Sequence, residues 1–123
     1  MARKLSGIQL KSDDHHIKAR NTIKQLASDN LFTDVTLVSD DNQTIQAHKA
    51  IIGHSSPYLF SLVKQSGKSI NLPTKYSFVI SILEYIYLGE TRVEVMEIKE
   101  FLNMVNIFQI HGLWFEENRD NFK

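Results

Sequence analysis

The segment from residue 32 to residue 59 constrains the fold more than any other part of this sequence. It holds two short runs, around Val35 to Leu37 and Ile45 to Ala47, in which apolar and polar residues alternate. Such alternation is typical of strands with one buried face. The residues between them, Ser39-Asp40-Asp41-Asn42, are strong turn formers. The segment therefore predicts a β-hairpin.

Two charged residues flank this hairpin, in sequence that otherwise has the composition of a core. Asp34 precedes the first strand and Lys49 follows the second. Charged side chains are rarely buried unless they are paired. The simplest interpretation is therefore a structural ion pair that fixes the register between the hairpin and the helix after it.

The remaining apolar residues follow helical or strand-like periods along the whole chain. Helical spacing predicts helices over residues 14–28, 76–88 and 97–110, a short helical turn at 50–52, and a helix that Ser55 or Ser56 caps before Pro57. Period-two alternation predicts strands at 8–10, 69–72 and 91–95, the last of them an edge strand. The fold class is thus α+β, with a small sheet at one side of a cluster of helices.

Composition excludes several classes of protein. The 123 residues suit one domain with a core of its own. There is no cysteine, and Lys plus Arg equals Asp plus Glu at 14 each. The absence of cysteine argues against a disulfide framework and a thiolate zinc site. The balanced charge argues against the net positive charge that is typical of nucleic-acid-binding domains. No apolar run approaches the roughly 20 residues of a membrane span, and the N-terminus lacks a signal-peptide pattern. We expect an intracellular domain with no contact to membrane.

No catalytic or metal-binding motif stands out. His15 and His16 are adjacent, so on a helix they point about 100° apart and would chelate one ion poorly. The other three histidines lack a partner at ligand spacing. His54 neighbours two serines, but there is no Gly-x-Ser-x-Gly motif and the serines suit helix caps better. The sequence predicts no enzyme, no metal and no cofactor.

Four segments in order resemble the BTB/POZ domain. They are Phe-Thr-Asp-Val at 32–35, Ala-His-Lys at 47–49, Ser-Ser-Pro-Tyr-Leu-Phe at 55–60 and Leu-Glu-Tyr-Ile-Tyr-Leu-Gly-Glu at 83–90. The detail is most similar to the Tramtrack group, whose members usually precede zinc fingers in transcription and chromatin proteins. The resemblance implies a BTB/POZ domain over residues 1–113. Residues 114–123 are then either a further helix or the start of a linker.

In dimeric members of that family, the N-terminal strand crosses to the partner subunit and pairs with its edge strand. The physical argument agrees, because a three-residue strand is marginal alone and an uncovered edge promotes association. The first helix would then pack against its symmetry mate. The resemblance thus implies a swapped homodimer whose interface contains Ile8, Gln9, Leu10, Ile17, Ala19, Ile23, Leu26, Arg92, Val93, Glu94 and Val95.

One departure from the Tramtrack group bears on larger assemblies. Its members usually carry aromatic-x-Leu-Arg-Trp-Asn-Asn where this chain has Ile-Gln-Leu-Lys-Ser-Asp-Asp at 8–14. That stretch is linked to assembly beyond the dimer, so the resemblance implies a dimer and leaves higher-order assembly open.

The implied function is protein–protein interaction: homodimerisation of a nuclear transcription or chromatin-architecture factor, with co-regulator recruitment. Asp34 and Lys49 match a charged pocket that the family uses near the dimer centre. Expected partners are a second copy, other BTB proteins or co-regulators, without direct nucleic-acid contact. Two alternatives stay open: a cytoplasmic substrate adaptor for a cullin-type ubiquitin ligase, and an oligomerising module with no further ligand.

Overall fold

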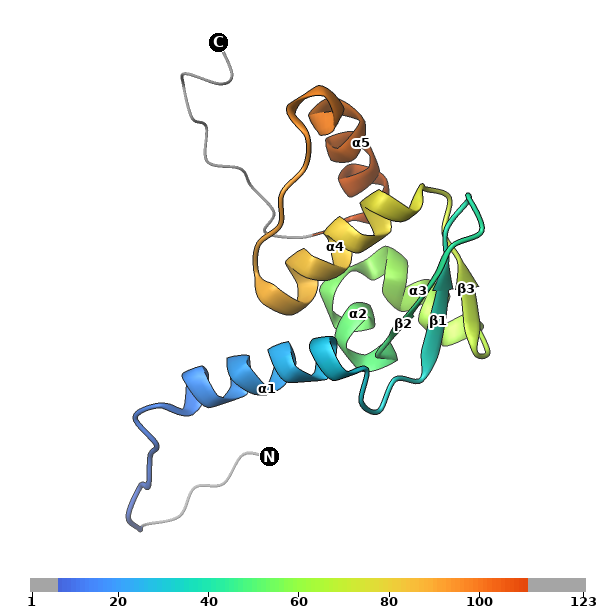
Figure 1. Ribbon diagram of the computed structural model, residues 1–123. Helices are drawn as coiled ribbons and strands as arrows, with labels where there is room; N and C mark the ends of the chain where they lie inside the picture. The colour runs from blue at the N-terminus through green and yellow to red at the C-terminus, as the bar shows by residue number, and fades with distance from the viewer. Residues whose placement is uncertain (1–6, 111–123) are drawn as a thin grey trace.

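The computed structural model describes residues 7–110 and confirms an α+β domain in which helices dominate (Figure 1). Three short strands form one mixed sheet in the order β2-β1-β3. The elements, in chain order, are α1 (His15–Asp29), β1 (Val35–Val38), β2 (Thr44–Ala47), α2 (Lys49–Ser55), α3 (Pro57–Gln65), β3 (Ser69–Asn71), α4 (Tyr76–Leu88), the 3-10 turn η1 (Val95–Glu97) and α5 (Ile98–Phe108).

The predicted hairpin is present. β1 and β2 pair antiparallel, with Val35 opposite Ala47 and Leu37 opposite Ile45, so both strands turn apolar side chains inward. In the turn, the Asn42 N–H donates to the Ser39 carbonyl at 3.0 Å. Asn42 has a φ of 62°, in the left-handed region that asparagine tolerates better than most residues. The third strand, β3, lies parallel to β1 on its other side.

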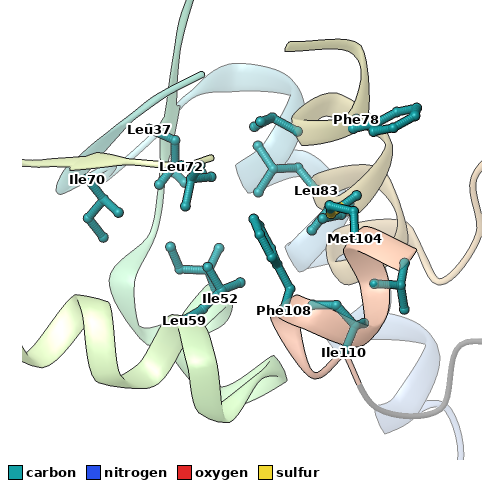
Figure 2. Close-up of a cluster of buried hydrophobic side chains, with 14 of the residues drawn as sticks. Leu37, Ile52, Leu59, Ile70, Leu72, Phe78, Leu83, Met104, Phe108 and Ile110 are labelled. Carbon is teal, nitrogen blue, oxygen red and sulfur yellow. The ribbon is translucent and has the colours of Figure 1, made fainter. Parts of the chain in front are cut away.

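One apolar core lies between the sheet and helices α2 to α5 (Figure 2). Leu37 from β1 and Ile52 from α2 are buried in it with side chains from α4 and α5. The aromatic rings of Phe78 and Phe101 meet edge to face at 5.3 Å, which joins α4 to α5. This core holds the four helices and the sheet in fixed positions.

The hairpin turn also holds the start of α4. The Asp41 carboxylate accepts hydrogen bonds from the Ser39 hydroxyl and, at 3.1 Å, from the Tyr76 N–H in the first turn of α4. The hydroxyl of Ser39 is the main cause that lowers the pKa of Asp41 below its ordinary value. A negative charge at a helix N-terminus is stabilising. Asp41 therefore fixes the hairpin against α4.

Ser56 connects the start of α3 with the end of α5. Its hydroxyl oxygen accepts the Leu59 N–H at 3.0 Å, which confirms Ser56 as the helix cap. The same hydroxyl donates to the carbonyl of Phe108, the last residue of α5. Both bonds are buried, so one side chain satisfies two backbone groups that water cannot reach.

The strands predicted at residues 8–10 and 91–95 are not present in the structure. Residues 8–10 belong to no strand, and Ile8 and Leu10 are 89% and 88% exposed. Residues 91–94 are irregular, and Val95 begins the 3-10 turn that leads into α5. A strand needs a neighbour to satisfy its backbone, and within one chain neither segment has one. The predicted edge strand at 91–95 is therefore wrong for the single chain.

Two helix ends also differ from prediction. The turn predicted at 50–52 is a full helix that continues past Gly53 to Ser55. Gly53 is buried against α3, with Phe60 as the nearest neighbour, so packing outweighs the low helix propensity of glycine. At the other end, α5 stops at Phe108, with Gln109 in the left-handed conformation. The segment 114–123, predicted as a further helix or the start of a linker, lies outside the described residues.

We predict that Ser56→Ala lowers the free energy of unfolding by about 1–3 kcal/mol, because it removes a helix cap and leaves the buried Phe108 carbonyl without a donor. Denaturant titration would measure this. Ser61→Ala, an exposed change within the same helix, is the control and should alter stability by less than about 0.5 kcal/mol. Equal effects of the two changes would contradict the role of Ser56.

Candidate interaction surface

Helix α1 is the least buried helix of the domain. None of its residues is fully buried, and Ile17 is 48% exposed. Figure 1 shows α1 projecting from the body of the domain, with only its C-terminal part against the rest. There, Ile23 and Ala27 pack on the core, mainly beside α4. A 15-residue helix is marginally stable in water by itself, so α1 depends on what its sides contact.

The structure separates the predicted interface residues into two groups. Ile23 and Leu26 are half-buried where α1 meets the domain, and Val93 is half-buried beside α4. The others, including the whole N-terminal segment, are exposed: Ile8, Gln9, Leu10, Ile17, Ala19, Arg92, Glu94 and Val95. The single chain brings none of residues 8–10 into pairing with residues 92–95.

The expected ion pair between Asp34 and Lys49 is not formed. The Asp34 carboxylate instead accepts the backbone N–H of Lys49, at 2.8 Å, and Asp34 is exposed. Among residues 7–110, no salt bridge joins the two side chains. Lys49 is the first residue of α2, so its N–H has no acceptor within the helix. The carboxylate of Asp34 supplies the missing acceptor. A salt bridge between Asp34 and the Lys49 ammonium would add little stability, because surface ion pairs contribute little.

His48 and Tyr87 form a buried hydrogen-bonded pair that no local sequence pattern predicts. The Tyr87 hydroxyl accepts the His48 backbone N–H at 2.9 Å and lies 2.7 Å from Nδ1 of the same residue. Nε2 of His48 bonds to the Leu31 carbonyl, which can only accept. In the neutral ring the proton is therefore on Nε2, and Nδ1 accepts the phenol hydrogen. Burial raises the pKa of Tyr87, with a further contribution from the charge of Asp34.

The loop before β1 exposes two apolar residues, Leu31 and Phe32, which were not among the predicted interface residues. Phe32 is 84% exposed and has a φ of 61°, and Leu31 beside it is 44% exposed. A positive φ is unfavourable for a bulky side chain. The bond from His48 to the Leu31 carbonyl holds this loop in place. Two adjacent apolar residues directly after the predicted helix end were the only available signal.

With this geometry in view, comparison with known proteins identifies the family. The family model for the BTB/POZ domain matches residues 23–117. This chain belongs to the BTB/POZ family. The match begins within α1 and takes in every later element, so it covers the sheet, the core and the hydrogen-bonded start of α2.

The BTB/POZ chain is similar to curated proteins of fly and human origin. It is 29% identical over 114 residues to longitudinals lacking protein-like of Drosophila melanogaster, covering 85% of this chain and 84% of that protein. It is 30% identical over 108 residues to protein tramtrack, alpha isoform, of the same organism, covering 85% of this chain but 13% of tramtrack. Human Kelch-like protein 2 is 26% identical over 105 residues, covering 80% of this chain and 18% of that protein.

BTB/POZ domains are non-enzymatic protein-interaction modules that commonly self-associate and bind other BTB proteins. Among the described residues of this chain, exposed large apolar side chains lie in the N-terminal segment, on α1 and the loop after it, and on α3, α4, η1 and α5. Within residues 7–110, no group of three or more His, Cys, Asp or Glu is arranged to hold a metal ion. No helix in the same range is long and apolar enough to cross a membrane.

We predict that Tyr87→Phe lowers the free energy of unfolding by about 1–3 kcal/mol, because the buried His48 N–H loses its acceptor. Thermal or denaturant unfolding would measure the loss. Tyr58→Phe is a matched control, since the Tyr58 ring stacks on Phe108 at 4.8 Å and that contact is kept. A loss that is no larger for Tyr87→Phe than for Tyr58→Phe would contradict the role of this hydroxyl.

Two variants test whether Asp34 stabilises the domain through its hydrogen bond to the Lys49 backbone N–H or through an ion pair with the Lys49 ammonium. Asp34→Ala should cost about 0.5–2 kcal/mol, as the loss of other helix-capping side chains does. Lys49→Gln keeps the backbone N–H and should change stability by less than about 0.5 kcal/mol. Denaturant titration of both variants and of the double variant is the test. A loss in Lys49→Gln as large as that in Asp34→Ala would favour the ion pair instead.

Proposed function

We propose that this domain homodimerises and joins two copies of a nuclear transcription or chromatin-architecture factor. The observation that carries the proposal is α1, a helix of 15 residues with no fully buried side chain. It leads into Leu31 and Phe32, which are also exposed. We define α1 together with Leu31 and Phe32 as the α1 surface. Its exposed apolar side chains, Ile17, Leu31 and Phe32, support an interaction site.

The N-terminal segment supports the same proposal. Ile8 and Leu10 are exposed apolar residues, and within residues 7–110 no strand pairs with residues 91–94. Pairing these two segments between subunits would satisfy both. A dimer that combines this pairing with the α1 surface would bury more than about 2,000 Å², as stable homodimers do.

The nuclear role rests on similarity. The resemblance to the Tramtrack group and the 30% identity to protein tramtrack favour a chain that works beside a DNA-binding region. Dimerisation would bring two such regions together, so that binding of the first raises the effective concentration of the second. The charged residues Asp34 and Lys49 then lie at the N-terminus of α2, where a co-regulator could contact them.

A second candidate is substrate adaptor for a cullin-type ubiquitin ligase, in the cytoplasm. Besides the similarity to Kelch-like protein 2, one observation favours it: Phe60 on α3 is 51% exposed, beside a groove between α2 and α3. Co-purification with a cullin scaffold, lost in Phe60→Ser, would support this function. Absence of cullin from the purified complex would remove it.

The dimer is tested by light scattering after size-exclusion chromatography across a dilution series. The 14.2 kDa chain should elute with twice its own mass, and a version that lacks residues 1–12 should dissociate at higher concentration or aggregate. A chain that stays monomeric throughout would sink the proposal. A larger discrete assembly would mean that residues 8–14 support association beyond the dimer.

Phe32→Asn tests the α1 surface without harming the fold. Asparagine tolerates a positive φ, so the monomer should be at least as stable as the wild type, while the dimer should dissociate at higher concentration. Ile107→Gln is the matched control, because Ile107 is exposed on α5, away from the α1 surface, and its loss should leave dimerisation unchanged. Equal weakening by both variants would rule out a specific role for Phe32.

A further inference from the structure

A small pocket lies where the C-terminal end of α1 meets α4 and β2. Its volume is about 160 Å³. Apolar side chains from all three elements line it, including Leu26 and Ala27 of α1, Ile45 of β2 and Leu83 of α4. The buried His48 and Tyr87 form part of its inner wall, and their polar atoms bond to each other and to Leu31. The interior therefore favours an apolar group.

The size of the pocket limits its ligand. A protein cavity of about 150 Å³ with aliphatic and aromatic walls accommodates benzene. By that comparison, this pocket admits one ring or a chain of four to six carbons, which is also the size of a single long side chain. A drug-sized ligand would need at least about twice the volume.

The mouth of the pocket carries negative charge. Glu84 is exposed and is the one carboxylate among the described lining residues, which include no lysine or arginine. Its Oε1 accepts the Thr91 hydroxyl at 2.9 Å, which restrains the side chain. Asn30, just after the last turn of α1, also lines the pocket, and α1 has no basic residue in that turn. The helix C-terminus therefore adds its partial negative charge to that of Glu84.

We propose that this pocket binds an amphipathic amine: an apolar group of four to six carbons inside, with a positively charged nitrogen at the mouth beside Glu84. The nitrogen could belong to a free amine or to a lysine side chain of a partner polypeptide, since both present the same chemistry. The site lies where α1 meets α4, and Leu26 and Ala27 of α1 contribute to its wall.

Titration of the isotope-labelled full chain, followed by the NMR signals of its backbone amides, tests the site. Benzylamine is the probe and benzyl alcohol is its neutral control. Both should shift amides around Ala27, Ile45 and Leu83, with the amine binding about two- to fivefold more tightly, the range of an exposed charge pair. Shifts elsewhere on the chain, or equal affinity for the two probes, would overturn the proposal.

Three variants measure how much the charge of Glu84 and the apolar interior of the pocket each contribute to binding. Glu84→Gln keeps an acceptor for Thr91 but should abolish the preference for benzylamine, while Glu100→Gln, the same charge change on α5 outside the pocket, should not. Ala27→Leu should fill the pocket and reduce the binding of both probes at least tenfold. The spectrum of each variant shows whether it is folded. Unchanged binding in Ala27→Leu would place the ligand somewhere else and overturn the site.

A last comparison separates the two sources of the amine. Butylamine matches the end of a lysine side chain, and a five-residue peptide of glycines around one lysine presents that side chain on a backbone. Tighter binding of the peptide supports a partner polypeptide, tighter binding of butylamine supports a free amine, and binding of neither overturns the proposal.

Discussion

The N-terminus of α2 is the point on which the rest of the domain depends. A helix begins with N–H groups that have no acceptor inside it. Here two of them are satisfied from distant parts of the chain: the His48 N–H by the hydroxyl of Tyr87 in α4, and the Lys49 N–H by the carboxylate of Asp34 before β1. One helix start thus fixes α4, the hairpin and, through the bond from His48 to the Leu31 carbonyl, the loop that ends α1.

The same principle extends to the other end of the domain. Ser56 caps α3 and binds the last carbonyl of α5, and Asp41 in the hairpin turn accepts an N–H from the first turn of α4. Among residues 7–110, no buried side-chain nitrogen or oxygen lacks a partner. In a domain of this size the helices are therefore joined by polar side chains as well as by the core, and each junction uses a single residue.

Prediction from sequence succeeded where the signal is local. Alternation and turn residues predicted the hairpin, helical spacing predicted α4, and Ser56 before Pro57 predicted the cap of α3. It failed where the partner is distant in sequence. His48 and Tyr87 are 39 positions apart, and no local pattern couples them.

The other incorrect predictions share a physical cause: backbone N–H and C=O groups need hydrogen-bond partners. The Asp34 carboxylate accepts the backbone N–H of Lys49 and forms no salt bridge with its ammonium, because the N–H at the start of α2 has no acceptor within the helix. Residues 8–10 and 91–95 have the composition of strands but pair with no strand in the described part of the chain, residues 7–110. An alternating side-chain pattern indicates that a segment is suited to a strand. The strand forms only when its backbone hydrogen-bonds to a neighbouring strand.

The exposure of α1 makes its stability a matter of mass action. Its last turns pack on α4, but its first turns contact little of their own domain. Any second molecule that covers them binds the folded helix and not the unfolded one. It therefore adds a free energy of stabilisation that grows with the logarithm of its own concentration. The helical content of this chain is thereby linked to how much of its partner surrounds it. The body of the domain, which has a core of its own, is free of that dependence.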